Sequence, residues 1–256
     1  MKTRVLAASL ALIAGAALPA SARSLEAIRS RGVLGLCAHP NSLPFASKKG
    51  DPPGFQIELG REIARRLGVT LEPDWVVTIY QIRSAECDIV LDTIADREAQ
   101  GETHLRISKP YYHSGVVLVV PQDSELTSFA SLDGRTKVGV QMGSMAAMVL
   151  DQRHVPISVF GFEDDSMDAV ANHEIAAAAV SPLAAGYYNL IHPNATLRIL
   201  GFDETEPALT WNVAVGMVRP DDALQREIDA AVEKLRSDGT IDQIYRRYGV
   251  ALERPK

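Results

Sequence analysis

Residues 33–45 read VLGLCAHPNSLPF, a short apolar run that leads into a loop containing two prolines. Leu59, Ile63 and Leu67 then recur every four residues, and Gly68 follows them. This spacing predicts an amphipathic helix that ends at a glycine. A strand, a loop and a helix in this order indicate an α/β fold with mainly parallel strands.

The same alternation continues along the chain. Four more apolar runs predict buried strands: residues 88–91, 116–120, 137–141 and 176–180. The second of these ends at Pro121, and we expect it to be a crossing segment. Near the C-terminus, Asp221 is placed to cap a helix, and Thr240 with Gln243 predicts a capping box at the start of another.

The N-terminus has the pattern of a secretory signal peptide. Lys2 and Arg4 precede an apolar run at residues 5–18, and residues 20–22 read ASA. The alternative is a membrane anchor, but the run is shorter than the roughly 20 apolar residues that span a bilayer. We therefore expect residues 1–22 to be removed and the rest to reside in the periplasm, without membrane insertion.

The composition indicates a globular chain with no nucleic-acid partner. Of its 256 residues 46% are hydrophobic and 23% charged, and the formal net charge is −6. Binding to phosphates needs an excess of Lys and Arg. In an exported chain the two cysteines, Cys37 and Cys87, could form a disulfide or remain as buried thiols, whereas a metal site is less favoured.

Ordered sequence blocks resemble the family 3 periplasmic solute-binding proteins. Their residues are 33–45, 54–55, 65–68, 87–90, 108–115, 131–134, 138–144 and 238–249. The resemblance implies an α/β fold of the two-lobed periplasmic-binding-protein type II, with a cleft between the lobes and two crossing segments. It places residues 24–114 and 211–256 in lobe 1 and residues 115–210 in lobe 2.

Amino-acid binders of that family hold the α-carboxylate with an arginine and a helix N-terminus, and the ammonium with a carboxylate. Gly143 and Ser144 precede a predicted helix and could offer amides and a hydroxyl to a ligand, although Ser144 could equally cap its own helix. Thr93 and Arg97 lie in the turn where the family has its arginine. Arg97 could serve, or could be a solvated loop residue paired with a neighbouring acid.

Val180 stands where the family has the acid that pairs with the ammonium group. A buried charge must be paired, so we expect no tight binding of ordinary L-amino acids. The resemblance also places His39, Asn41 and Phe45 in the first-lobe ligand loop. Val180, Tyr187 and Trp211 are further expected lining residues. If the cleft holds a partner protein, we expect it to be wide or apolar with few convergent charges, whereas a cleft for a small polar solute would show several donors and acceptors aimed at one point.

Further features are similar to the MoxJ/XoxJ-type subgroup, which is associated with pyrroloquinoline-quinone (PQQ) alcohol dehydrogenases. They are Cys37, Cys87, and residues 181–188 and 211–217. The similarity implies an accessory or activation partner of a PQQ-dependent alcohol (methanol) dehydrogenase. It also favours a Cys37–Cys87 disulfide, although one cysteine is late in its strand and the other early, which would separate them in simple parallel register.

Two other functions stay open. The first is the substrate-binding subunit of an ABC importer, with a permease and a small non-zwitterionic solute as partners. The second is an enzyme resembling cyclohexadienyl dehydratase. No spacing typical of a catalytic site stands out, however, and we expect no catalytic residues and no enzymatic activity. The acidic runs at residues 163–168 and 203–206 match no metal loop and are interpreted as solvated faces. We expect a monomer without metal or cofactor.

Overall fold

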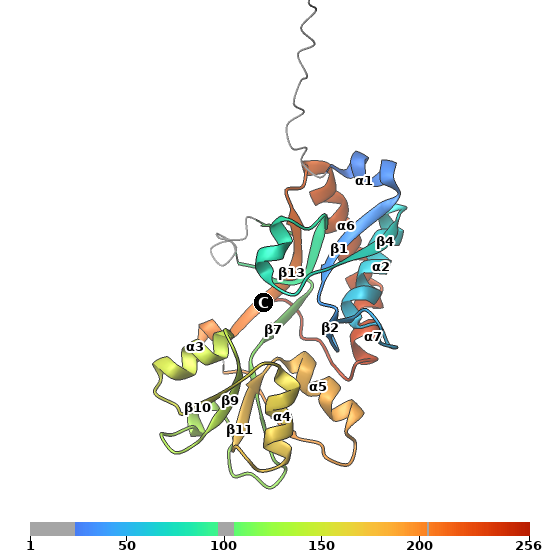
Figure 1. The fold of residues 1–256 in the computed structure, drawn as a ribbon. Helices are drawn as coiled ribbons and strands as arrows, with labels where there is room; N and C mark the ends of the chain where they lie inside the picture. Colours follow the sequence, from blue (N-terminus) through green and yellow to red (C-terminus); the bar gives the residue numbers. More distant parts are fainter. Residues whose placement is uncertain (1–23, 97–104, 204) are drawn as a thin grey trace, which may run out of the picture.

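The computed structural model describes residues 24–96, 105–203 and 205–256 and shows two lobes joined through β7 and β13 (Figure 1). The predicted signal peptide at residues 1–22 lies outside the described residues. In the described part of the chain, no helix has the length and apolar character needed to cross a membrane.

The upper lobe in Figure 1 is built on a sheet with the order β4-β1-β5-β13-β6, and β7 also pairs with β13. Strands β4 and β5 run parallel to β1, whereas β13 is antiparallel to β5. The strands are β1 (Val33–Ala38), β4 (Thr70–Trp75), β5 (Ile89–Ile94), β6 (Leu105–Ile107), β7 (Tyr112–Gly115) and β13 (Thr210–Val218), with a separate hairpin of β2 (Asn41–Ser42) and β3 (Ala46–Ser47). The helices are α1 (Leu25–Arg31), α2 (Phe55–Leu67), η1 (Ile79–Arg83), α6 (Asp222–Ser237) and α7 (Thr240–Arg246).

The lower lobe has a sheet of order β10-β9-β11-β8-β12, with an apolar cluster on each face. Its central strand β11 is built of small residues, AAAV, all buried because helices cover both faces. The strands are β8 (Val117–Val120), β9 (Val138–Gln141), β10 (Ile157–Phe160), β11 (Ala177–Val180) and β12 (Arg198–Leu200). The helices are α3 (Met145–Gln152), α4 (Glu163–Ala171), α5 (Pro182–Ile191), η2 (Phe129–Ser131) and η3 (Pro207–Leu209).

The crossing between the lobes is shorter than the sequence predicted. Residues 116–120 were expected to cross, but Val117–Val120 forms β8, which lies inside the second sheet between β11 and β12. Strand pairing changes from the first sheet to the second between Gly115 and Val117, and Gly115 is paired with Thr210 at the start of β13. Two adjacent antiparallel strands therefore link the lobes.

A buried carboxylate anchors the first crossing strand to the first lobe. Oδ1 of Asp92 accepts hydrogen bonds from the hydroxyls of Tyr111, Tyr112 and Tyr245, each at 3.0 Å. Its Oδ2 accepts from Nε2 of Gln56 at 2.8 Å. Burial raises the pKa of Asp92, and the four hydrogen bonds oppose that shift. The network ties β5, β7, α2 and α7 together beside the hinge.

Helix ends show where local patterns succeed and where one fails. Gly68 ends α2 with a left-handed φ of 78°, and Oδ1 of Asp221 accepts from the Leu224 N–H at 2.7 Å, as predicted. The predicted capping box at Thr240 is wrong. Helix α7 begins at Thr240 itself, after Gly239 with φ 79°, and Oδ1 of Asp238 accepts from the Thr240 N–H and hydroxyl instead.

Helix α5 of the second lobe packs directly on the C-terminal segment of the first. A Cβ on Gly186 would lie 2.6 Å from the carbonyl oxygen of Gly249, so the two backbones touch only because both residues are glycine. Leu183 is buried in the first-lobe core, and the rings of Tyr187 and Tyr248 lie 6.0 Å apart. These contacts fix α5, which lines the second-lobe side of the interlobe space, against the first lobe.

Candidate functional site

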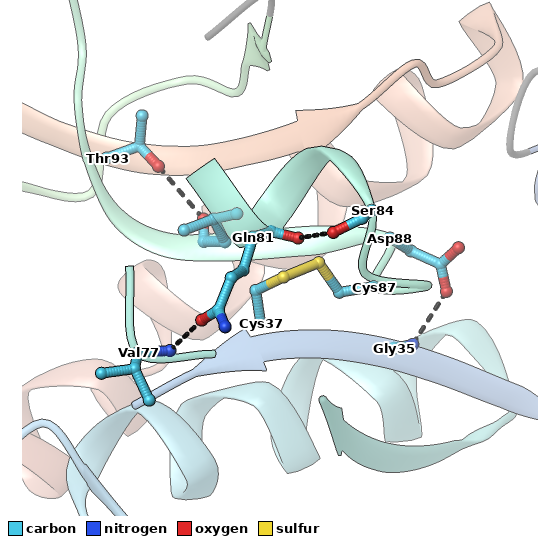
Figure 2. The surroundings of a disulfide bond; sticks show 9 residues. Gly35, Cys37, Val77, Gln81, Ser84, Cys87, Asp88 and Thr93 are labelled. Atoms are coloured by element: carbon cyan, nitrogen blue, oxygen red, sulfur yellow. Dashed lines mark hydrogen bonds between the residues drawn. A yellow bond between two sulfur atoms is a disulfide. The ribbon is translucent and has the colours of Figure 1, made fainter. Parts of the chain in front are cut away.

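A disulfide braces the first-lobe side of the interlobe space (Figure 2). Cys37 and Cys87 are joined, with their Cα atoms 5.2 Å apart. In the parallel register Cys37 lies opposite Val90, not Cys87. The bridge forms because Gly35 lets the chain before β5 pass close over β1: a Cβ on Gly35 would lie 3.0 Å from the Cα of Cys87.

Hydrogen bonds fix the segment that follows β4. Oε1 of Gln81 accepts from the Val77 N–H at 2.6 Å and from the Thr78 N–H at 3.1 Å, and these residues form a capping box at the start of η1. Figure 2 shows this turn beside the disulfide. Together they set the position of Val77, Thr78 and Ile82, which face the space between the lobes.

That space is a cavity of about 930 Å³ lined by both lobes. The structure places the predicted residues His39, Asn41 and Phe45 on its first-lobe wall. Nδ1 of His39 accepts from the Asn41 N–H at 3.2 Å, and the Phe45 ring lies 5.3 Å from that of Phe55. The other first-lobe lining residues are Cys37, Ala38, Ser42, Leu43, Pro44, Gln56, Val76, Val77, Thr78, Ile82, Val90 and Leu91.

The second-lobe wall consists mainly of two helix faces. From α4 come Glu163, Asp164, Met167 and Asp168, whose i, i+1, i+4, i+5 spacing places them on one face. From α5 and its cap come Ser181, Ala184, Tyr187, Tyr188, Ile191 and His192, again with helical spacing. Gln141 and Phe162 complete the lining.

The orientation of α4 follows from its close packing on the sheet. A Cβ on Gly139 in β9 would lie 2.7 Å from Ile175 and 3.0 Å from the Cβ of Ser166, so a glycine is needed for α4 to lie this near. Ser166 is fully buried and donates to the Glu163 carbonyl at 2.6 Å. With Ser166, Ala169 and Val170 held against the core, Glu163, Asp164 and Asp168 are turned toward the cavity.

Two of these carboxylates accept hydrogen bonds from α5 or its N-cap residue. Glu163 accepts the Ser181 N–H on Oε1 at 2.6 Å and the Ser181 hydroxyl on Oε2 at 2.8 Å. Burial raises the pKa of Glu163, the bonds to Ser181 oppose the shift, and the nearby charge of Asp164 adds to it. Asp168 accepts the Tyr188 hydroxyl at 2.8 Å, and burial together with this bond raises the pKa of Tyr188.

Several residues predicted to line the cleft lie elsewhere. Thr93 is 8% exposed and donates its hydroxyl to the Val90 carbonyl at 3.2 Å. Ser144 caps α3, accepting the Ala147 N–H at 3.1 Å, so the capping alternative describes it. Gly143 takes a left-handed φ of 73° in an exposed turn before that helix. None of these three is among the described lining residues of the cavity.

Val180 and Trp211 need separate corrections. Val180 is 1% exposed and points into the core of the second lobe, while the next residue, Ser181, faces the cavity. Trp211 pairs with Ser114 in the crossing strands and packs against the cores of both lobes, not in the cavity. Arg97 lies outside the described residues, so its side chain is not placed.

The expected shortage of charge in the cleft is also wrong. Asp164 and Asp168 are exposed, as the interpretation of residues 163–168 as a solvated face expected, but together with Glu163 they line the cavity. Their helical spacing was visible in the sequence, but only the packing of α4 beside α5 places that face inward. Within the described ranges no group of three or more His, Cys, Asp or Glu residues is arranged to hold a metal ion.

Comparison with known proteins agrees with this architecture. The model of "Bacterial extracellular solute-binding proteins, family 3" matches residues 34–251. A curated relative, "Probable amino-acid-binding protein YxeM" of Bacillus subtilis, is 24% identical over 84% of this chain and 83% of its own.

Two solved structures share the two-lobed fold. The "Ancestral Cationic Amino Acid Solute Binding Protein (AncCDT-1)" superposes with a TM-score of 0.75 and 22% identity, covering 88% of this chain and 99% of that one. "Periplasmic binding protein XoxJ from Methylobacterium extorquens AM1" gives a TM-score of 0.68 at 22% identity, with 86% and 98% covered. The two-lobed periplasmic-binding-protein fold predicted from the sequence is therefore confirmed, whereas the finer MoxJ/XoxJ assignment is not distinguished by these identities.

Proposed function

The chain belongs to the family 3 bacterial extracellular solute-binding proteins, and we propose that it is the solute-binding subunit of an ABC importer in the periplasm. The observation that carries this proposal is the cavity of about 930 Å³ between the lobes, a volume in the range of small-molecule sites. Relatives named as binding proteins of amino-acid ABC transporters support it.

The proposed action is capture by lobe closure. We assign residues 24–114 and 211–256 to the first lobe and residues 115–210 to the second, with bending at the paired strands near Gly115 and Thr210. A solute contacting both walls stabilises the closed state, which the permease then recognises. This is binding without chemistry, and the relatives named above as binding proteins favour it over a dehydratase-like enzyme.

The test is transport by the reconstituted system. An ABC permease and ATPase of the amino-acid importer class from the same organism would be placed in proteoliposomes, with the mature protein and a periplasmic small-molecule extract outside. We expect the protein to stimulate ATP hydrolysis several-fold only when extract is present. Stimulation that is absent under all conditions, or present without any small molecule, would contradict the proposal.

A second candidate is an accessory partner of a PQQ-dependent alcohol dehydrogenase. It is favoured by apolar side chains exposed on both walls, such as Val77 and Phe162, which could hold a segment of a partner protein. The tagged protein and its Phe162→Ser variant would be used to capture partners from periplasmic extract. Retention of a quinoprotein dehydrogenase by the first and not by the second supports this candidate, and no dehydrogenase with either excludes it.

A further inference from the structure

The cavity exposes large apolar side chains from both lobes. Val77 is 63% exposed, Ile191 51%, Phe162 46% and Leu43 39%, and all four line the cavity. Apolar surface left open to water in a binding cleft is unfavourable until a ligand or partner covers it. A solute that fills this space therefore needs an apolar body.

The Asp and Glu side chains among the described lining residues of the cavity come from one helix. Glu163, Asp164 and Asp168 lie on the same face of α4, and no Lys or Arg is found among the described residues that line the cavity. A carboxylate ligand placed there would be desolvated beside three carboxylates, with His39 and His192 as its potential cationic partners among the described lining residues. An ammonium group would instead be attracted by all three acids.

Two of the carboxylates keep an oxygen for a ligand. The Tyr188 hydroxyl uses Oδ1 of Asp168, and the Asp165 N–H uses Oδ1 of Asp164, so these bonds leave the second oxygen of each acid available. Glu163 is different, because both of its oxygens accept from Ser181. Asp164 and Asp168 are thus the direct ligand contacts, and Glu163 adds negative potential behind them.

We propose that the cavity binds a primary amine with an apolar alkyl or aryl body and no carboxylate. The ammonium group is held by Asp164 and Asp168, and the apolar body lies between Val77 and Leu43 on one wall and Phe162 and Ile191 on the other. The inference rests on the proposed binding function and names its solute class.

The first test compares ligands that differ by one group. Phenethylamine, L-phenylalanine and 3-phenylpropanoate share a phenyl ring. Phenethylamine carries an amine alone, 3-phenylpropanoate carries a carboxylate alone, and L-phenylalanine carries both. Hexylamine and L-norleucine give the alkyl counterpart. In calorimetric titration with the mature protein we expect each amine to bind at least tenfold more tightly than its amino acid. Both ligands can make charge-assisted hydrogen bonds through the ammonium group, but only the amino acid carries a carboxylate that the acids of α4 repel.

The outcomes are decisive in both directions. Binding of an amino acid as tight as that of its amine would show that a cationic group, such as Arg97, completes a carboxylate site, and would overturn the proposal. So would the absence of measurable binding by both amines. Binding of 3-phenylpropanoate in preference to phenethylamine would overturn it as well.

The second test uses variants on α4. Asp164→Asn and Asp168→Asn should each weaken the binding of the better amine by about tenfold or more, as expected for a hydrogen bond to a charged group. Asp165→Asn is the matched control, because it removes the same charge from the same helix at a residue outside the cavity lining. Equal loss in all three variants would indicate a diffuse charge effect and contradict the proposed contacts.

The proposed solute class and the proposed importer function can be overturned independently of each other. If the permease is stimulated by the protein with an amino acid, the importer function stands and the amine assignment is overturned. If phenethylamine or hexylamine binds through Asp164 and Asp168 but neither it nor any extract stimulates the permease, the amine site stands and the importer function is overturned.

Discussion

The two walls of the interlobe cavity are built by different means. The first-lobe wall is made of loops and strand ends, held by the Cys37–Cys87 disulfide, and the described residues that line it include no Asp, Glu, Lys or Arg. The second-lobe wall is made of the faces of α4 and α5 and carries all three carboxylates. Both walls therefore present apolar side chains, whereas the carboxylates found among the described lining residues lie on the second-lobe wall.

This difference in construction also predicts which substitutions destabilise each wall. Loops have few internal hydrogen bonds to restore their shape, so the first-lobe wall depends on its covalent bridge. Helix faces are maintained by packing on the sheet, so the second-lobe wall depends on close contacts such as those of Gly139 and Gly186.

The largest expected effect is on the first-lobe wall. Replacing both Cys37 and Cys87 by serine should lower the free energy of unfolding by about 2–4 kcal/mol, because the bridge closes a long loop with a sequence separation of 50 residues. Urea unfolding of the wild type and the double variant measures the loss. Dithiothreitol should destabilise only the wild type, and an equal effect on both proteins would contradict the assignment.

Breaking the contact of α5 with the first lobe should have the next largest effect. In Gly186→Ala the new methyl group meets the Gly249 carbonyl, so the segments must separate, at a cost of about 1–3 kcal/mol. Thermal unfolding measures the loss, and small-angle scattering reports any opening of the lobes. Gly134→Ala is the control, since no atom lies within 4 Å of a Cβ there. Equal stability of the two variants would show that the glycine contact is unimportant.

The sequence predicted the fold well because its signals are local. Helix periodicity, glycine ends and apolar strand runs each depend on a few neighbouring residues, and most elements follow from them. The capping box predicted at Thr240 was wrong because another local arrangement competes with it. Asp238 accepts the Thr240 hydroxyl, and α7 begins directly after Gly239. Local competition of this kind shifts a boundary without changing the fold.

The site was predicted less well because it depends on which face of an element points inward. Successive side chains of a strand point to opposite faces, so a one-residue difference in alignment separates a cavity residue from a core residue. Val180 enters the core and Ser181 faces the cavity. For α4 the acidic run at residues 163–168 was recognised in the sequence, but what that face meets is set by α5, more than ten residues later in the chain.

A pH titration sharpens the comparison between the charged and the neutral wall. Burial places the pKa of Glu163 above its usual value, so its negative charge is complete above that pKa and disappears as the pH falls through it. Amine affinity should therefore decrease on acidification from neutral pH, by up to about tenfold per pH unit over the interval of proton uptake. Calorimetry in buffers of different ionisation enthalpy would detect the protons released on binding.

The control for this titration is Glu163→Gln, which keeps an acceptor for the Ser181 N–H. His39, His192, Asp164 and Asp168 line the same cavity and are present in both proteins, and the hydroxyl of Tyr188 is bonded to Asp168. The difference between the wild-type and Glu163→Gln profiles isolates the Glu163 contribution. Profiles that coincide would show that the charge of this residue does not contribute to binding.

The smallest expected effect concerns the apolar part of the neutral wall. Val77→Ala removes two methyl groups that a bound solute would only partly cover, so amine affinity should fall by about three- to fivefold. Because Val77 is 63% exposed in the free protein, stability should stay within about 0.5 kcal/mol of the wild type. Val159→Ala is the matched control, because this valine is 56% exposed on β10 and lies outside the cavity lining.

A comparison of two ligands tests whether the first-lobe contacts select shape and not charge. If they do, Val77→Ala should weaken the binding of phenethylamine and of the uncharged 2-phenylethanol by the same factor. A loss confined to the amine would mean that the first-lobe wall also takes part in recognising charge.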